Sequence, residues 1–385
     1  MKQCFLLCLF LCLAFQSFGL AAGKYKITSF SRVFYDDNVF MRASSATNKT
    51  DTIYYSQSLG IDAKFFNDKI TLKGTPEIRH RLVDNKTQYF GSLAVKGKHE
   101  LGPKIVVETA NTFAHAEREP SSLDDDIDVT YFSNKHQTKV SWQPRYLTKL
   151  RFQYNNHVKR WSENLPLGQD MTNGDFTKNA YQLTLEQIIH RRFIFEVVGN
   201  TSQLNYNGTR GGIDTASYYT QLSYVPNSFT IAKVNYGMIW ADVENQDNVI
   251  TQYNTPTYGA NITFFTPRGT VLGFNMIYEV MDSSVGYWNM KENLKLMMIA
   301  KYPITPKLEV SAMLLDMHTT YKDIGNRYSN IGLEREEEVV VSSITLSWRY
   351  NEFHYAEVGY QGMHLFNDDA DVFKNKVFLG YRFIF

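Results

Sequence analysis

The sequence predicts an all-β protein: a transmembrane, antiparallel, up-and-down β-barrel of about 18 strands, with 16 strands as the alternative. Three observations indicate this fold. Segments of alternating apolar and polar residues follow one another along the chain, short and long connections alternate between them, and the last segment, 372–385, ends on an aromatic residue. A soluble β-sandwich or β-helix, the competing fold, would not need the alternating lengths of the connections, the terminal aromatic strand or the signal peptide described below.

The last segment has two chemically different faces. From Val377 to Phe385 every second residue is apolar or aromatic, whereas Lys374, Lys376 and Arg382 lie on the other face. One face therefore suits lipid and the other suits water. The segment resembles the C-terminal strand of bacterial outer-membrane barrels. That resemblance implies a signal read by the β-barrel assembly machinery, carried here by Tyr381, Phe383 and Phe385.

Residues 1–22 have the pattern of a secretory signal peptide. An apolar run over 4–15 precedes small residues, and cleavage is expected after Ala21 or Ala22. The run is shorter than the roughly 20 residues that a transmembrane helix needs. The mature chain, 23–385, is then a single barrel domain. All three cysteines are removed with the signal, so neither disulfide nor thiol chemistry is expected.

Alternation of hydrophobicity with a period of two predicts each strand, and turn-forming residues predict its ends. The expected strands are 24–34, 52–66, 69–81, 88–100, 104–115, 127–142, 146–161, 176–189, 192–204, 215–225, 229–242, 253–265, 270–281, 287–302, 307–321, 337–350, 353–366 and 372–385.

The connections between these strands fall into two sets. One set is short and rich in Gly, Pro and Asn, which suit tight turns. The other set is mostly longer and polar: 35–51, 82–87, 116–126, 162–175, 205–214, 243–252, 282–286, 322–336 and 367–371. In bacterial barrels the short turns are periplasmic and the long loops are extracellular. This predicts an outer-membrane protein with both termini in the periplasm. The loops 35–51 and 322–336 are expected to fold inward and narrow the lumen.

Charge is distributed unevenly along the chain. The long connections hold 22 acidic and 8 basic residues, although the whole chain has a formal net charge of only +1. The strands and short turns therefore carry a basic excess. Lys or Arg facing lipid costs about 2–4 kcal/mol, so alternation places these bases in the lumen. The predicted pore-lining bases are Lys73, Arg79, Arg81, Lys96, Lys98, Lys135, Lys139, Lys149, Arg151, Lys233, Lys291, Lys295, Arg349, Lys374, Lys376 and Arg382.

A basic lumen has two interpretations. It raises the local concentration of anions and disfavours cations, or it only rigidifies the wall through ion pairs with inward acids. The first predicts a porin-like channel for small hydrophilic solutes, including anionic ones. Export of an exopolysaccharide and a non-conducting surface barrel are the alternatives. The expected partners are outer-membrane lipid, lipopolysaccharide, and small solutes or polysaccharide, without nucleic acid; the oligomeric state is open.

The sequence contains no HExxH, CxxC, P-loop or Gly-x-Ser-x-Gly motif, and its nine histidines do not have metal-ligand spacing. We therefore expect no catalytic residue, no metal site, no cofactor and no enzymatic activity.

One further segment carries a resemblance. Residues 32–40, Arg-Val-Phe-Tyr-Asp-Asp-Asn-Val-Phe, close the first expected strand and begin the connection after it. They resemble the start of an outer-membrane β-barrel porin family, some members of which are associated with exopolysaccharide production. The resemblance implies a porin-like envelope protein, and no functional residues are carried over from it.

Overall fold

The computed structural model is described for residues 24–38, 51–83, 85–117, 130–161, 175–206, 212–244, 250–282, 290–322, 334–367 and 371–385. The predicted signal peptide and parts of the predicted long connections lie outside these ranges. Among the described residues, no helix is long and apolar enough to cross a membrane.

The described residues form strands joined by turns. Their bounds are β1 Lys24–Asp36, β2 Thr52–Phe65, β3 Ile70–Gly74, β4 Glu77–Arg81, β5 Lys86–Glu100, β6 Ile105–Glu117, β7 Thr130–Arg145, β8 Thr148–Trp161, β9 Phe176–His190, β10 Phe193–Tyr206, β11 Ile213–Asn227, β12 Thr230–Glu244, β13 Ile250–Phe265, β14 Val271–Asp282, β15 Met290–Pro303, β16 Leu308–Lys322, β17 Glu334–Arg349, β18 His354–Asn367 and β19 Asp371–Ile384.

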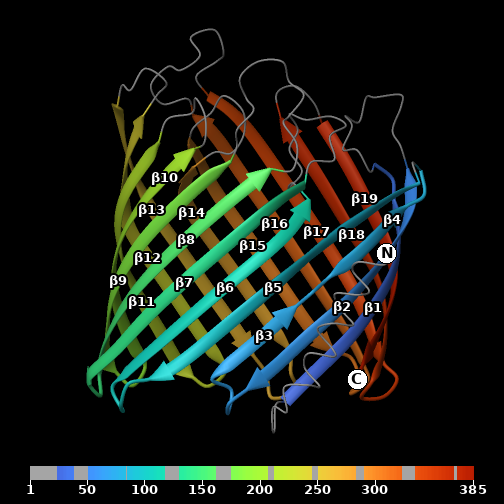
Figure 1. Ribbon diagram of the computed structural model, residues 1–385, viewed down its shortest axis with the longest axis horizontal. Helices are drawn as coiled ribbons and strands as arrows, with labels where there is room; N and C mark the ends of the chain where they lie inside the picture. Colours follow the sequence, from blue (N-terminus) through green and yellow to red (C-terminus); the bar gives the residue numbers. More distant parts are fainter. Residues whose placement is uncertain are drawn as a thin grey trace.

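These strands form one closed barrel, in which chain neighbours pair antiparallel (Figure 1). The barrel closes where β1 pairs with β19, in register from Thr28 opposite Ile384 to Asp36 opposite Lys376. β3 and β4 each pair with both β2 and β5, so they are two halves of one strand of the wall. The wall therefore has 18 strands, which confirms the predicted all-β barrel and its strand number.

The break between β3 and β4 falls at Pro76, which has no backbone N–H to donate. Across from it, Gly91 has a φ of 155°, and a Cβ at this position would lie 2.9 Å from Cα of Pro76. Hydrogen bonds from Leu59 N to Pro76 O (2.9 Å) and from Thr75 N to Ser92 O (2.8 Å) span the break. The irregularity is therefore local and leaves the wall closed.

The two ends of the barrel differ in their connections. We call the end with the short connections the turn end and the opposite end the loop end. At the turn end Asn67 and Asp68 have φ values of 57° and 65°, and Gly269 has a φ of 88°. These residue types tolerate the left-handed conformation that tight turns require. β1 begins and β19 ends at the turn end, and the terminal backbone N–H of Phe385 donates to Ile27 O at 2.8 Å.

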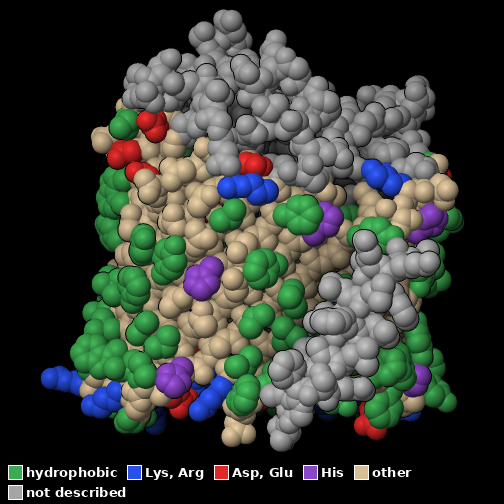
Figure 2. All heavy atoms as spheres, viewed as in Figure 1, with side chains coloured by type: hydrophobic (Ala, Val, Ile, Leu, Met, Phe, Trp, Pro, Cys, Tyr) green, Lys and Arg blue, Asp and Glu red, His purple; other side chains and the backbone are tan. Residues whose placement is uncertain are grey.

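The outer face of the wall is mainly apolar. Five different strands each expose an apolar side chain on this face: Phe152, Leu183, Val234, Met298 and Leu379. On each strand the residues that alternate with the outward ones face the lumen. In Figure 2, apolar side chains lie between the two ends of the barrel, most densely at the left and toward the turn end, whereas charged side chains gather at the two ends. This arrangement is the reverse of a soluble protein and suits a wall surrounded by lipid.

At the loop end, β14 and β15 depart from the wall. β13 and β14 pair only from Tyr258 opposite Tyr278 to Phe265 opposite Val271, although both strands continue toward the loop end. Beyond this point Val280 and Met290 have the parity of outward-facing residues. They nevertheless share a buried cluster with inward-facing residues of β9 to β12, namely Phe176, Leu204, Ile213, Ala241 and Val243.

The outer face of this β14–β15 end therefore packs on the inner face of the neighbouring wall, inside the lumen. A contact of the neighbouring strand β16 supports this position. Lys322 has outward parity, yet its Nζ lies 5.7 Å from the ring centroid of the inward-facing Tyr253. The predicted narrowing by 35–51 and 322–336 falls largely outside the described residues. Within them, the strand ends themselves narrow the lumen.

Candidate functional site

The lumen face is the candidate site. All the predicted pore-lining bases have the strand parity opposite to that of the exposed apolar residues, which places them on this face. Arg81 is buried at the loop end of β4. Nine of the others make ion pairs: Lys73, Arg79, Lys98, Lys139, Arg151, Lys295, Lys374, Lys376 and Arg382. Whether these bases contact a solute stays a prediction.

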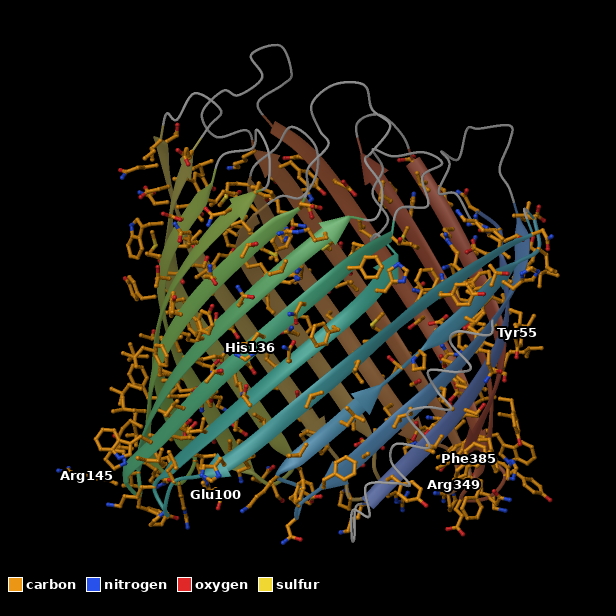
Figure 3. All side chains as sticks on the ribbon, in the orientation of Figure 1. Tyr55, Glu100, His136, Arg145, Arg349 and Phe385 are labelled. Atoms are coloured by element: carbon orange, nitrogen blue, oxygen red, sulfur yellow. The ribbon has the colours of Figure 1, made fainter. Side chains whose placement is uncertain are left out.

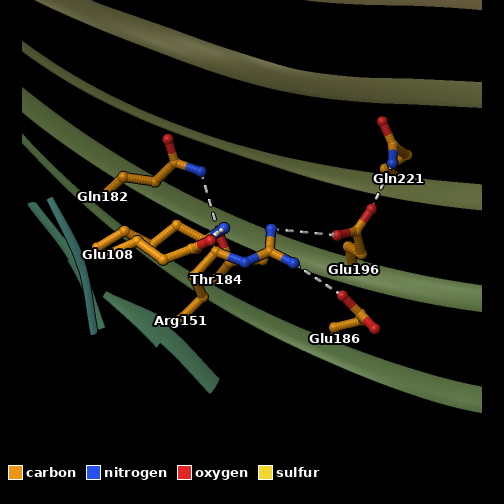
Figure 4. Close-up of polar contacts among 8 residues, drawn as sticks. Glu108, Arg151, Gln182, Thr184, Glu186, Glu196 and Gln221 are labelled. Atoms are coloured by element: carbon orange, nitrogen blue, oxygen red, sulfur yellow. Dashed lines mark hydrogen bonds and ion pairs between the residues drawn. The ribbon is translucent and has the colours of Figure 1, made fainter. Parts of the chain in front are cut away.

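A polar network crosses the lumen face from β8 to β11 (Figure 4). The guanidinium of Arg151 lies 2.9 Å from the carboxylate of Glu186 and 4.0 Å from that of Glu196. Gln221 donates a further hydrogen bond to Glu196. One arginine thus faces two inward carboxylates, so these three side chains together carry a net charge of −1 and add no positive charge to this part of the wall.

Other inward carboxylates are compensated singly. Glu108 lies 2.7 Å from Nζ of Lys139, and Asp62 lies 3.0 Å from Nζ of Lys73. Exposed ion pairs of this kind contribute little to stability. Their effect here is mainly electrostatic, because each pair cancels one negative and one positive charge on the lumen face.

Five of the predicted bases have no such partner. Within the described ranges, no ion pair or hydrogen bond is formed by the side chains of Lys96, Lys135, Lys149, Lys233 and Lys291. Their strands, β5, β7, β8, β12 and β15, are spread around the wall. The lumen face therefore has lysine side chains outside any ion pair on several sides.

Asp36 was assigned to a long connection from the sequence, and that assignment is wrong. The residue ends β1, its side chain is 1% exposed, and its carboxylate lies 3.4 Å from Nζ of both Lys374 and Lys376. The backbone N–H of Asn38 donates to the same carboxylate at 3.2 Å. The Asp-Asp-Asn segment of the sequence therefore joins the first and last strands.

The neighbouring Asp37 strengthens the same junction. Its carboxylate accepts hydrogen bonds from the backbone N–H (2.6 Å) and side-chain amide (2.7 Å) of Asn375. The amide of Asn38 donates to Phe373 O at 2.9 Å. Asp36, which ends β1, and the two residues after it thus all contact β19, a role that alternation alone did not reveal.

Arg32, which was not among the predicted residues, also lies on this lumen face. Together with Arg382 it contacts the largely buried carboxylate of Glu357, at 3.6 Å and 2.7 Å. Its inward parity on β1 was available from the sequence. The pairing was not, because Glu357 comes from β18.

Inward aromatic rings gather beside these charges. Phe34 stacks on Tyr54 with ring centroids 4.5 Å apart and lies 5.6 Å from the ring of Phe378. The guanidinium of Arg32 lies 5.1 Å from the Phe378 centroid, within cation–π range. Gly359 leaves room for this ring, since a Cβ there would come within 2.3 Å of it. Pairing of β1 with β2 and with β19 brings these three rings together.

A cavity of about 560 Å³ opens at the turn end. Glu309, the carboxylate that lines it, pairs with Lys301 at 2.9 Å. Arg349, marked at this end in Figure 3, donates from Nη2 to Pro306 O at 3.3 Å. The other bases that line the cavity are Arg268, Lys307 and Arg382. A solute at this mouth therefore meets a positive surface.

The described residues include no group of three or more His, Cys, Asp or Glu that could hold a metal ion. What the lumen face offers a solute is ion pairing, hydrogen bonding and contact with aromatic rings.

Comparison with known proteins supports the fold. No family model and no curated protein matches the chain. Among solved structures, it is similar to OccK2 (OpdF) of Pseudomonas aeruginosa, with 13% identity over 94% of this chain and 98% of that one and a TM-score of 0.51. A BenF-like porin from Pseudomonas fluorescens Pf-5 has 9% identity, covers 95% and 100% of the two chains, and gives a TM-score of 0.51. At these identities the similarity establishes a shared barrel fold.

Proposed function

We propose that this chain is a porin-like channel of the bacterial outer membrane, with both termini in the periplasm. It lets small hydrophilic solutes pass passively and favours anions. The observation that carries the proposal is the excess of unpaired lysines on the lumen face of a closed 18-strand barrel. A wall of this size encloses more space than its side chains fill, and uncompensated cations raise the local concentration of anions.

The structural neighbours support this proposal through their descriptions. One is the OccK2 (OpdF) barrel in complex with glucuronate, and another is described as a BenF-like porin. A channel function is thus known for barrels of this fold, and glucuronate, a carboxylated sugar, is an anion of the class that unpaired lumen lysines would favour here.

The test is ion selectivity of the refolded protein in a planar bilayer under a salt gradient. We expect an anion preference that shifts toward cations when Lys135, Lys149 and Lys291 are changed together to Gln. The control changes Lys69, Arg191 and Arg192 to Gln, which removes the same charge from exposed turns. Reversal potentials that respond equally in both variants would contradict a lumen effect.

The same preparation separates the alternatives. A folded barrel without conductance would support the non-conducting surface barrel. Flux of an acidic polysaccharide through the protein in liposomes, without flux of small anions, would support polysaccharide export.

A further inference from the structure

Polar side chains interrupt the apolar outer face of the barrel on β6, β7 and β8. These strands expose Phe113, Phe132, Trp142 and Phe152 on their outer faces. Residues of the same parity form what we call the polar patch: Thr109, Asn111, Asn134, His136, Thr138 and Asn156.

The polar patch lies within the apolar band and not at its edge. Figure 3 places His136 about halfway between the two ends of the barrel. On β7 the exposed Phe132 lies on the loop-end side of the patch and Trp142 on the turn-end side. In Figure 2, the middle of the face in view has only sparse apolar side chains. If the band contacts lipid, the patch is at a depth where water is scarce.

The polar patch is continuous, because its members are cross-strand neighbours. Asn111 on β6 is directly opposite His136 on β7, which in turn is opposite Asn156 on β8. Thr109 is opposite Thr138 in the next outward row. Directly paired side chains on one face of a sheet lie close enough to act as a unit.

Hydrogen bonding within the barrel satisfies only part of the patch. Nε2 of His136 lies 3.0 Å from Oγ1 of Thr138, and Asn156 donates to Asn179 at 2.9 Å. The side-chain oxygens of Asn111 and Asn134 are buried and have no hydrogen-bond partner. A buried amide oxygen without a donor destabilises a protein, and lipid supplies no donor. These two oxygens are enclosed by the barrel's own atoms, so a partner would cover only the accessible remainder of the patch, which lipid leaves without hydrogen bonds.

We propose that the polar patch is the contact surface between two copies of this chain in the membrane. Threonine hydroxyls both donate and accept and asparagine amide N–H groups donate, so two copies of the patch can hydrogen-bond across a twofold axis. It contains no lysine or arginine, which an anionic lipid head group would need. In lipid, neutral polar side chains stabilise contacts between membrane segments by hydrogen bonding across them. The inference relies on the membrane location in the proposed function, and conduction is not required.

The first experiment uses the absence of cysteine from residues 23–385. His136→Cys in native outer membranes, treated with a short bis-maleimide, should give a product of twice the monomer mass. The matched control is Val234→Cys, an exposed outward residue on β12, which should stay monomeric. No dimer from His136→Cys, equal cross-linking of both variants, or capture of a different protein would each overturn the inference.

The second experiment separates an interface from a patch that merely faces lipid. Light scattering of the purified protein in detergent should give a dimer, and Asn111→Leu with Asn134→Leu should halve that mass. If the patch only faces lipid, the same change leaves the mass unaltered and raises resistance to urea, which overturns the inference. Conductance is measured on the same samples. A non-conducting dimer would keep this inference and remove the channel function, whereas a conducting monomer would do the reverse.

Discussion

Among single residues, Asp36 links the two ends of the folded chain most directly. It contacts Lys374 and Lys376 of β19 from the last position of β1, and its side chain is 1% exposed. A buried carboxylate loses hydration, so its contribution depends on retaining both ammonium groups. Closure of the barrel therefore has an electrostatic component at the loop end of the β1–β19 pair.

We expect Asp36→Asn to lower the free energy of unfolding by about 3 kcal/mol, because it removes the buried charge that both partly exposed ammonium groups contact. Urea unfolding in detergent, followed by the heat-modifiable migration of the barrel on gels, measures this change. Asp68→Asn is the control, since Asp68 is exposed and 3.8 Å from Lys64; such pairs contribute about 1 kcal/mol or less. Equal effects of the two substitutions would show that burial of Asp36 does not matter.

Among the elements, the loop ends of β14 and β15 carry a packing that is unusual for a barrel wall. Their outer face is buried against the inner face of β9 to β12, and Met290 and Leu204 are each 1% exposed. Apolar burial on the lumen side stabilises this position. The narrowing therefore depends on a few apolar contacts, which a single charged side chain can disrupt.

We expect Met290→Glu to release the strand ends from the lumen and raise single-channel conductance, because a carboxylate placed among the apolar side chains of this cluster would lose its hydration. Met290→Leu, which conserves volume, should leave the conductance unchanged. Lower or equal conductance in a folded Met290→Glu barrel would mean that these strand ends do not narrow the conducting path.

For the whole molecule, the sequence was sufficient to predict the 18-strand wall. Each strand must present apolar residues to lipid and polar residues to water, so the period of two is visible residue by residue. The break at Pro76 did not disturb this pattern, because the parity of Ile70 and Ile78 is the same on both sides of it.

Contacts between distant strands were not predictable in the same way. The bases of the lumen follow from parity, but their compensation by particular acids depends on register and barrel curvature. Asp36 was misassigned because its acidic neighbours resemble a loop. Val280 and Met290 occupy positions that alternation assigns to the outer face, but they are buried inside the lumen. No rule based on alternation could therefore have predicted their packing.

Pairing of β1 with β19 has a consequence for the order of the chain. The start of β1 and the end of β19 lie side by side at the turn end, so a short linker can join them. New ends can then be opened between His190 and Arg191. The wall would keep every strand neighbour, but the chain would no longer finish on Phe385. Such a circular permutant should refold in detergent with the heat-modifiable migration of the parent, yet fail to enter the outer membrane of living cells. Insertion in cells at the parent level would mean that assembly reads the strands without regard to which of them comes last.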